Sequence, residues 1–508
     1  MSAPWSLPER AQWLDLPVRR GRDLQRGTVE GQAYAHNPAG FDALALLNRR
    51  AVRLLDAADG RSLGQLLAEW GQDEPAAAQQ WLGELPLLWR NGFLVSPGVA
   101  VPQPIAGERV FNAWLHLTNA CNLACPYCYI HKSKRHMSAH VVERVLASIA
   151  ATAQSGQVER IHVRYAGGEP MLRFDAMRRF HAQATAACAA SGVKFSAAVL
   201  TNGAAVPAGA TEWLRANQVS VSMSIDGVGA LQDAMRPVVG GGSSFARVSA
   251  GLDAYLAAGI RPYMLITVGD SNLDGLPELT QFLLDRGLWF RYSLVRDLQW
   301  GAGVLDDRHG AEHGPSDSES APEILQGAPL RRVQAVFGRC YDLIESYVLA
   351  QGQLALASGR RPDVGFRRSH HFCDLQPWAP IRQACGAGRS YLAIGEQGQV
   401  SPCQAALHRD GTNEIAGQSL LALAAGQTQL PDFKRTQPNT ACSRCPHRLS
   451  CAGGCPLLLH RREGHVNGRS PYCEVFKAVL PRIVHIAALE LAHQARFARS
   501  SAHVDSKD

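Results

Sequence analysis

Three cysteines in the stretch TNACNLACPYCY, residues 118–129, are the side chains of this sequence best suited to chemistry. Cys121, Cys125 and Cys128 follow the spacing C-x3-C-x2-C. Three thiolates at this spacing can hold three corners of a cubane iron–sulfur cluster, and the run supplies no fourth thiolate. The fourth iron would then be open to a small molecule, as the open position of a catalytic metal site is.

Two other interpretations of this run are a zinc loop and three buried thiols. Zinc sites favour paired C-x2-C units and four ligands, which the run does not contain. Pro126 fixes φ and stiffens the loop, and Tyr127, between the last two cysteines, can cover a cluster. The iron–sulfur interpretation is therefore favoured.

The run resembles the signature of radical S-adenosylmethionine (SAM) enzymes, in which C-x3-C-x2-C follows a β-strand and an aromatic residue precedes the last cysteine. The resemblance implies that the three cysteines bind a 4Fe–4S cluster whose open iron holds the amino and carboxylate groups of SAM. One electron then cleaves SAM to methionine and a 5′-deoxyadenosyl radical, which takes a hydrogen atom from the substrate.

Five more residues match this family. Glycines let backbone approach a ligand, and a carboxylate can accept a hydrogen bond from an ammonium group. The resemblance implies that Gly167, Gly168 and Glu169 contact the amino group of SAM. It also implies that Ser224 bonds the ribose and that Arg236 pairs with the carboxylate. The alternatives are a plain turn, a strand-end serine and a surface arginine.

Strand and helix patterns alternate between residues 110 and 300, which implies an α/β fold with a parallel sheet and right-handed crossovers. Six units are too few for an eight-stranded barrel, and they match the partial (β/α)6 barrel of the radical SAM family. We expect strands at 112–118, 160–165, 195–200, 220–225, 263–268 and 289–294, with helices at 139–153, 174–190, 211–217, 245–258 and 276–286.

A second group of cysteines follows, with the spacing C-x12-G-x4-C, then C-x2-C-x5-C-x3-C, then a final cysteine. Read alone, it is compatible with a pair of zinc ribbons. It resembles the seven-cysteine SPASM extension of radical SAM enzymes, which implies two auxiliary 4Fe–4S clusters and three clusters in total. One set would be Cys385, Cys403 and Cys455, with Cys373 as its fourth member, and the other Cys442, Cys445, Cys451 and Cys473.

Cys188 and Cys340 fit no ligand pattern and are predicted to be core thiols. His370 and His371 precede Cys373 and are predicted to be surface side chains; the alternative is that they are ligands of the Cys373 cluster or donate hydrogen bonds to its ligands.

The bulk composition indicates a globular chain of 508 residues with two or three domains. It contains no apolar run of about 18–20 residues and no basic-then-apolar start, so we expect a cytoplasmic protein without a membrane span. Thirteen cysteines in such a chain point to metal ligation and not to disulfides. The net charge of +7 is modest and no Lys/Arg block occurs, so we do not expect nucleic-acid binding.

Residues 31–98 combine small strands, three helices and a closing strand, a winged-helix-like pattern. It resembles the domain of peptide-modifying radical SAM enzymes to whose sheet edge the leader of a precursor peptide adds as a strand. A cap or wing that binds nothing is the alternative. The expected units are a flexible arm (1–30), this domain (31–98), the barrel (110–300), a linker or mobile loop (301–330), a bridging helix region (331–372), the SPASM domain (373–480) and a C-terminal helix and tail (481–508).

These features predict a radical SAM/SPASM peptide maturase that oxidatively crosslinks side chains of a ribosomally made precursor peptide, with flavodoxin or ferredoxin as electron donor. One alternative is a sulfatase-maturating enzyme that makes formylglycine. In that family an Asp base follows the second SPASM cysteine, whereas Gln404 follows Cys403 here. An alternative of another class is a zinc-loaded binding or adaptor protein. No catalytic base stands out in the sequence.

Overall fold

The structure is a computed structural model, and the predicted linker at 301–330 lies almost wholly outside the part of the chain that it describes. Within that part, no helix is long and apolar enough to cross a membrane. The described residues are 9–101, 108–130, 132–296, 329–369, 371–380, 386–407, 413–427, 439–463 and 465–504.

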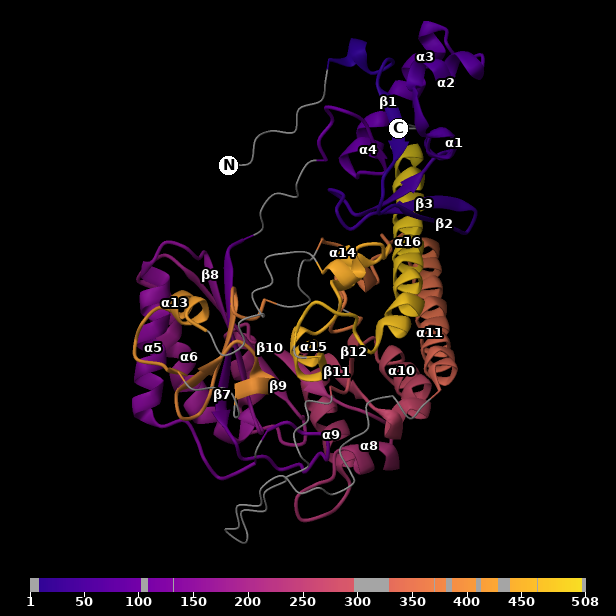
Figure 1. Cartoon of the computed structure of the whole chain (residues 1–508). Helices are drawn as coiled ribbons and strands as arrows, with labels where there is room; N and C mark the ends of the chain where they lie inside the picture. Colours follow the sequence, from indigo (N-terminus) through magenta and orange to yellow (C-terminus); the bar gives the residue numbers. More distant parts are fainter. Residues whose placement is uncertain are drawn as a thin grey trace.

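A nine-stranded sheet carries the active-site region and confirms the predicted partial barrel (Figure 1). Six strands run parallel in the order β12-β11-β10-β9-β8-β7, and β13 joins them parallel to β7. β14 and β15 extend the sheet antiparallel. The bounds are β7 Val110–Thr118, β8 Arg160–Gly167, β9 Lys194–Thr201, β10 Ser220–Ser224, β11 Tyr263–Val268, β12 Phe290–Leu294, β13 Tyr391–Ile394, β14 Gln399–Ser401 and β15 Asn413–Glu414.

The helices between the parallel strands also agree with the sequence, because their N-terminal caps and apolar periodicity are clear. Ser138 accepts a hydrogen bond from the amide of Val141, and Ser243 accepts one from the amide of Ala246. One short helix, α8, was not predicted, since six residues after a glycine carry little periodicity. The bounds are α5 Ala139–Gln154, α6 Phe174–Ala189, α7 Ala210–Ala216, α8 Ala230–Met235, α9 Ser244–Ala257 and α10 Leu276–Leu284.

The front of the chain forms two small antiparallel sheets and four helices. One sheet has the order β5-β1-β6 and the other the order β2-β3-β4. The bounds are β1 Pro17–Arg20, β2 Gln25–Val29, β3 Gln32–His36, β4 Leu44–Leu47, β5 Asp59–Ser62, β6 Leu94–Val95, α1 Arg49–Ala57, α2 Leu63–Glu69, α3 Pro75–Leu82 and α4 Leu85–Arg90.

Two details of the front differ from the sequence expectation. Residues 17–29 are not a flexible arm, because β1 is the central strand of its sheet and buries Val18 completely. Where three helices are expected within 31–98, the structure has four, since Pro86 occupies the first turn of α4 and cannot continue α3. A capping box between Ser62 and Gln65 begins α2.

Two long helices, α11 Leu330–Ala357 and α16 Cys473–Val504, run side by side and connect the barrel with the front unit (Figure 1). α16 packs against β2 and β4, and Glu30 at the tip of the β2–β3 hairpin lies 3.2 Å from His493 and 3.0 Å from Arg496. α16 begins at Cys473, eight residues before residue 481, where the C-terminal helix was expected to start.

The remaining C-terminal elements are short and carry the second cysteine group. The helices are α13 Leu420–Ala425, α14 Arg448–Cys451 and α15 Pro456–Glu463. Arg448 of α14 forms an ion pair with Asp23, so this region also touches the front unit.

Replacing Gly352 by alanine is expected to lower the melting temperature of the anaerobically purified protein. A Cβ at Gly352 would lie 1.9 Å from Nδ1 of His493, so α11 and α16 would have to separate, at a cost of about 1–3 kcal/mol. Gly338 in the same helix is the matched control, because its Cβ would meet nothing within 4 Å. Gly338→Ala should raise the melting temperature, because alanine favours a helix over glycine by up to about 1 kcal/mol. Equal shifts in both variants would contradict this packing.

Candidate active site

A cavity of about 280 Å³ opens at the C-terminal ends of the parallel strands, where active sites of parallel barrels lie. The cysteine loop that follows β7 forms part of its wall, together with Gly167 and Gly168 at the end of β8. Ser224 at the end of β10 also lines it. Gln404 and Ala405 from the C-terminal region complete the lining, so two distant parts of the chain share one cavity.

Cys121, Cys125 and Cys128 all line this cavity, as the sequence predicts. The cysteine loop is held to the segment after α8, because the amide of Ala124 donates a hydrogen bond to the carbonyl of Pro237 at 2.8 Å. The amide of Leu123 lies 3.4 Å from the Cys121 sulfur. Burial raises the pKa of the Cys121 thiol to about 11, and neighbouring Lys132 acts in the opposite direction.

The donor set suits an iron–sulfur cluster. Three soft sulfur ligands face one cavity, and all three are free cysteines and not disulfides. As the side chains stand, no three His, Cys, Asp or Glu residues in the described ranges are placed to hold one metal ion. The assignment therefore depends on ligand type, spacing and a shared cavity.

Gly167 and Gly168 allow the end of β8 to run directly against the cysteine loop. A Cβ at Gly167 would lie 2.3 Å from the carbonyl oxygen of Thr118, and one at Gly168 would lie 2.2 Å from that of Ala120. The amide of Gly168 also donates to the Thr118 carbonyl at 2.7 Å. Any side chain here would displace the loop that carries the cysteines.

Glu169 differs from the expectation that its carboxylate accepts a hydrogen bond from the amino group of SAM. It is fully buried and is not part of the cavity lining. Its carboxylate accepts hydrogen bonds from the amide of Met171 at 3.0 Å, the hydroxyl of Thr201 at 2.8 Å and the amide of Asn202 at 2.7 Å. Glu169 therefore ties the end of β8 to the end of β9, while its two glycine neighbours face the cavity.

The pH dependence of the protein's stability should reveal the raised pKa of the Glu169 carboxyl. Burial raises its pKa from 4.5 to about 7, although the three hydrogen bonds favour the ionised form. A carboxyl whose pKa is raised by folding stabilises the protein fully below pH 4.5, and this contribution is lost as pH rises to about 7. We expect wild type to lose about 3 kcal/mol across that window relative to Glu169→Gln. The measurement is the melting temperature against pH.

The control for this experiment is the exposed Glu212. Its pKa is lowered by a hydrogen bond from its own backbone amide and by one from the Thr211 hydroxyl. Glu212→Gln should leave the pH profile between 4.5 and 7 like that of wild type. A Glu169→Gln profile parallel to wild type would show that burial of this carboxyl does not matter.

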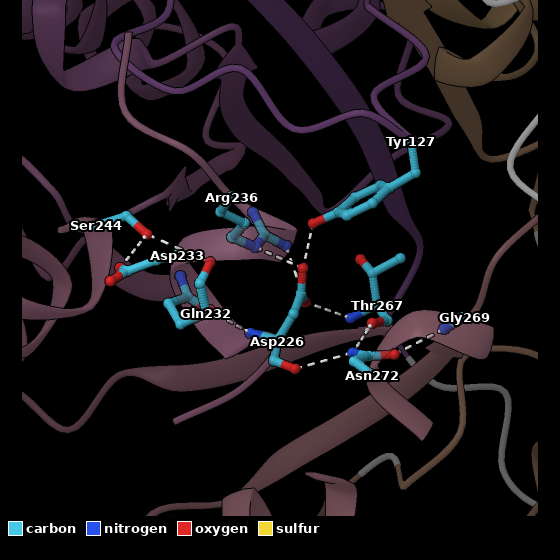
Figure 2. Close-up of polar contacts among 9 residues, drawn as sticks. All are labelled: Tyr127, Asp226, Gln232, Asp233, Arg236, Ser244, Thr267, Gly269 and Asn272. Carbon is cyan, nitrogen blue, oxygen red and sulfur yellow. Dashed lines mark hydrogen bonds and ion pairs between the residues drawn. The ribbon is translucent and has the colours of Figure 1, made fainter. Parts of the chain in front are cut away.

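Asp226 is a residue of the site that no sequence motif singles out. It is fully buried, and its carboxylate binds Arg236 through two contacts, Nε at 2.7 Å and Nη2 at 3.1 Å (Figure 2). It also accepts hydrogen bonds from the hydroxyl of Tyr127 and the amide of Thr267. One carboxylate thus connects the cysteine loop, β11 and the arginine after α8.

The consequence is that Tyr127 and Arg236 are held in fixed positions on the cavity wall. Burial raises the pKa of Tyr127 well above its usual range, so its hydroxyl stays protonated and donates to Asp226. The Arg236 guanidinium lies 5.6 Å from the centre of the Tyr127 ring. Arg236 is therefore not a surface arginine, and its partner within the chain is Asp226. The signal in the sequence is an Asp ten residues before an Arg at the same strand edge.

Comparisons with known proteins agree with this geometry. Residues 115–283 match the profile of the radical SAM superfamily. The pre-heme d1 synthase of Dinoroseobacter shibae is 30% identical over 365 residues, which cover 70% of this chain and 84% of that protein. The chain belongs to the radical SAM superfamily.

Two further likenesses concern a relative and a solved structure. The mycofactocin maturase MftC of Mycolicibacterium smegmatis is 28% identical over 367 residues, covering 70% of this chain and 81% of that protein. The structure of anSMEcpe with bound AdoMet and the Cp18Cys peptide superposes with a TM-score of 0.56 at 16% identity, covering 75% of this chain and 99% of that chain. The likeness to anSMEcpe shows a shared fold.

As a radical SAM enzyme, the protein uses SAM and an iron–sulfur cluster. The cavity brings together the cysteines with Tyr127, the two glycines, Ser224 and Arg236. Thr201 and Asn202, at the end of β9, also line it, and the Asn202 side-chain amide lies 3.7 Å from the Cys121 sulfur.

The second cysteine group of this radical SAM enzyme gathers in two places. Cys373 and Cys403 interact electrostatically, and both interact with Arg296, as does Cys455. Cys385, the remaining member of this set, lies outside the described residues. Cys451 interacts with Cys442 and Cys473, and Cys473 with Cys445. Which of these cysteines share a cluster stays a prediction.

The other cysteines and histidines separate into confirmed and corrected predictions. Cys188 and Cys340 are completely buried core thiols, as predicted. His371 was predicted to be at the surface, which is wrong: it is buried because its ring stacks on Phe366 at 3.9 Å. His370 lies outside the described residues.

Proposed function

We propose that this radical SAM enzyme is a peptide maturase that oxidises, and in particular crosslinks, side chains of a ribosomally made precursor peptide. Cys121, Cys125 and Cys128 would hold a cluster whose bound SAM would supply the radical that takes a hydrogen atom from the substrate. The relative MftC is a maturase, and anSMEcpe was solved with a bound peptide. These relatives support a peptide as the substrate class.

The observation that carries the proposal is the shared cavity. Its wall contains the three cysteines after β7, and also Gln404, Ala405 and Arg296, which adjoin Cys403 and Cys373. Tyr129 is half-buried and interacts with both Cys128 and Cys403. A substrate in this cavity therefore lies between the site that starts the oxidation and a second thiol site that can hold an electron acceptor.

We further propose that the second cysteine group holds two auxiliary 4Fe–4S clusters. The first set would be Cys373, Cys385, Cys403 and Cys455, and the second Cys442, Cys445, Cys451 and Cys473. The position of Cys373 supports its membership, since its amide donates to Tyr292 on β12 at 3.1 Å and its thiol faces Arg296. Burial raises the pKa of Cys373, but Arg291 and Arg296 outweigh it and lower the pKa, which favours the ligating thiolate.

The chain's own residues have three tasks in this scheme. Asp226 orients Arg236 and Tyr127 on the cavity wall. The carboxyl of Glu169 fixes the strand ends whose glycines line the cavity. Apolar lining such as Leu200, Leu265 and Trp114 reduces water near the reacting atoms.

We propose that the front unit binds the leader of the precursor by adding a strand to a sheet edge. In the described part of the chain, β5 and β6 are the outer strands of the sheet built on β1. Val95 of β6 is 39% exposed, which leaves an apolar side chain beside a free edge. We propose that a low-potential carrier such as flavodoxin or ferredoxin supplies the electron and that the protein is cytoplasmic, which its need for reduced thiol ligands supports.

The test uses the full chain, reconstituted with iron and sulfide without oxygen. It is incubated with SAM, a reductant and the product of a short reading frame beside its gene. We expect 5′-deoxyadenosine and a peptide that has lost a pair of hydrogen atoms. Formation of 5′-deoxyadenosine without any change in the peptide would contradict the maturase proposal for that peptide class.

The two alternatives give different results in the same assay. A sulfatase-maturating enzyme would produce an aldehyde on a sulfatase peptide, but the neutral Gln404 stands where that reaction needs a base. The Gln404 side chain accepts a hydrogen bond from the Tyr391 hydroxyl at 2.6 Å, which holds it in the cavity wall. A colourless protein with stoichiometric zinc would support the adaptor.

A further inference from the structure

The charges of the cavity lining are unbalanced. The described lining contains four cationic side chains and no aspartate or glutamate. Three of the four have acceptors within the chain. These are Arg236 with Asp226 at 2.7 Å, Arg296 with Asp374 at 2.6 Å, and Lys132 with the carbonyl of Leu123.

Arg291 is the fourth cation; it interacts electrostatically with the Cys373 thiol but has no hydrogen-bonded acceptor among the described residues. No ion pair or hydrogen bond connects its side chain to any described residue, and its Nε is buried without an acceptor. It lies on β12 and pairs in register with Leu265 of β11. A guanidinium that is partly withdrawn from water and lacks an acceptor is costly, unless a ligand supplies the anion.

A second guanidinium increases this demand. Arg164, on β8, is close enough to Arg291 for the two like charges to repel each other, and burial lowers the pKa of Arg164. Arg164 also forms no ion pair or hydrogen bond with the described residues. An anion beside Arg291 would satisfy an unused donor and reduce this repulsion.

SAM is the other candidate for that anion, and the first experiment below distinguishes it from a carboxylate of the peptide. The carboxylate of SAM would lie at the open iron, next to the cysteine loop that follows β7. β7 and β12 are at opposite ends of the six-strand parallel run, and Arg291 lies on β12. Arg291 lines the same cavity as Ser293 and Gln404.

We propose that Arg291 is a substrate-recognition residue that binds a carboxylate of the peptide. Gln404, which lines the same cavity, is uncharged and would not repel that carboxylate. The proposal deepens the proposed function and rests on it for the substrate class. The carboxylate is either the C-terminus of the peptide or the side chain of an Asp or Glu beside the reacting residue. A planar guanidinium suits either, because it can donate two parallel hydrogen bonds.

The first experiment needs no turnover, so its failure is distinct from failure of the maturase proposal. The reconstituted holoenzyme, saturated with SAM, is treated with the arginine reagent phenylglyoxal, and the modified residues are mapped by mass spectrometry. Propionate should slow modification of Arg291 about tenfold at saturation, while propionamide should not. The exposed Arg215 on α7 is the internal reference, and its rate should be the same in both.

Each other outcome overturns the proposal. If SAM alone protects Arg291 fully, the arginine is a SAM contact. If Arg291 is unreactive in the holoenzyme but reactive in the cluster-free protein, it serves as a counter-charge near Cys373. Equal protection by propionate and propionamide would show that charge is not recognised.

The second experiment uses a precursor peptide that the enzyme modifies. Arg291→Gln should raise the KM for this peptide about tenfold or more, and Arg291→Lys should recover part of the loss. If the C-terminus is the recognised group, C-terminal amidation of the peptide should reproduce the effect in wild type. If a side chain is recognised, exchange of Asp or Glu for Asn or Gln should do so. An unchanged KM in Arg291→Gln would reject the proposal.

Discussion

Cys125→Ala should reduce 5′-deoxyadenosine formation to background. Cys125 lies in the middle of the three-cysteine loop, is only 9% exposed and lines the cavity. Two remaining thiolates cannot hold a cubane securely, so both the cluster and its open iron are lost. Iron content should fall by one cluster, while the second cysteine group keeps its iron. The measurements are 5′-deoxyadenosine by chromatography and iron per chain.

The matched control is Cys188→Ala, the same substitution at a thiol that is completely buried in α6, away from the cavity. It removes one buried sulfur and should cost about 1 kcal/mol of stability, with SAM cleavage retained. A Cys125→Ala enzyme that still cleaves SAM at the wild-type rate would refute the assignment of this loop. Loss of cleavage in both variants would mean that the assay reports only stability.

Asp226→Asn should produce the second large effect, on both stability and SAM affinity. Asn keeps the shape but removes the charge that pairs with Arg236, and it leaves a buried guanidinium unpaired. Breaking a buried pair from one side costs about 3–5 kcal/mol. Tyr127 and Arg236 would no longer be held on the cavity wall, so SAM should bind at least about tenfold more weakly. Melting temperature and equilibrium dialysis with labelled SAM measure the two effects.

Two variants separate these effects. The carboxylate of Asp233, on α8, accepts hydrogen bonds from Ser244 and from the amide of Phe245, outside the cavity (Figure 2). Asp233→Asn should cost about 1 kcal/mol and leave SAM affinity unchanged. The double variant Asp226→Leu with Arg236→Met removes both charges, so it should recover stability but not SAM binding. If the double variant bound SAM normally, the Asp226–Arg236 pair would be structural alone.

The strands and most helices of the barrel could be predicted because each carries its own local pattern. Alternating burial along the strands and serine caps such as Ser138 and Ser243 are visible in a short window of sequence. The cysteines and glycines were found for the same reason, since their spacing within one loop is itself the signal. The sequence therefore predicted which segments reach the cavity, and the structure confirmed that they share it.

The charge network could not be predicted, because its partners are distant in sequence. Asp226 meets Tyr127, 99 residues earlier, and the amide of Thr267, 41 residues later. Glu169 was assigned to a ligand because its neighbours are glycines, but its carboxylate faces Thr201 and Asn202 across the strand ends. β1 was missed since its residues Arg19 and Arg20 look like a surface arm, and only pairing with β5 and β6 makes them a strand.

The transfer of deuterium from peptide to SAM-derived product tests the central claim most directly, namely that one cavity joins SAM cleavage to oxidation of a peptide. The precursor is prepared with deuterium on its side chains and turned over once by the reconstituted enzyme. We expect 5′-deoxyadenosine that carries one deuterium and a peptide that has lost a pair of hydrogen atoms. Unlabelled 5′-deoxyadenosine, formed at the same rate with or without the peptide, would contradict this claim.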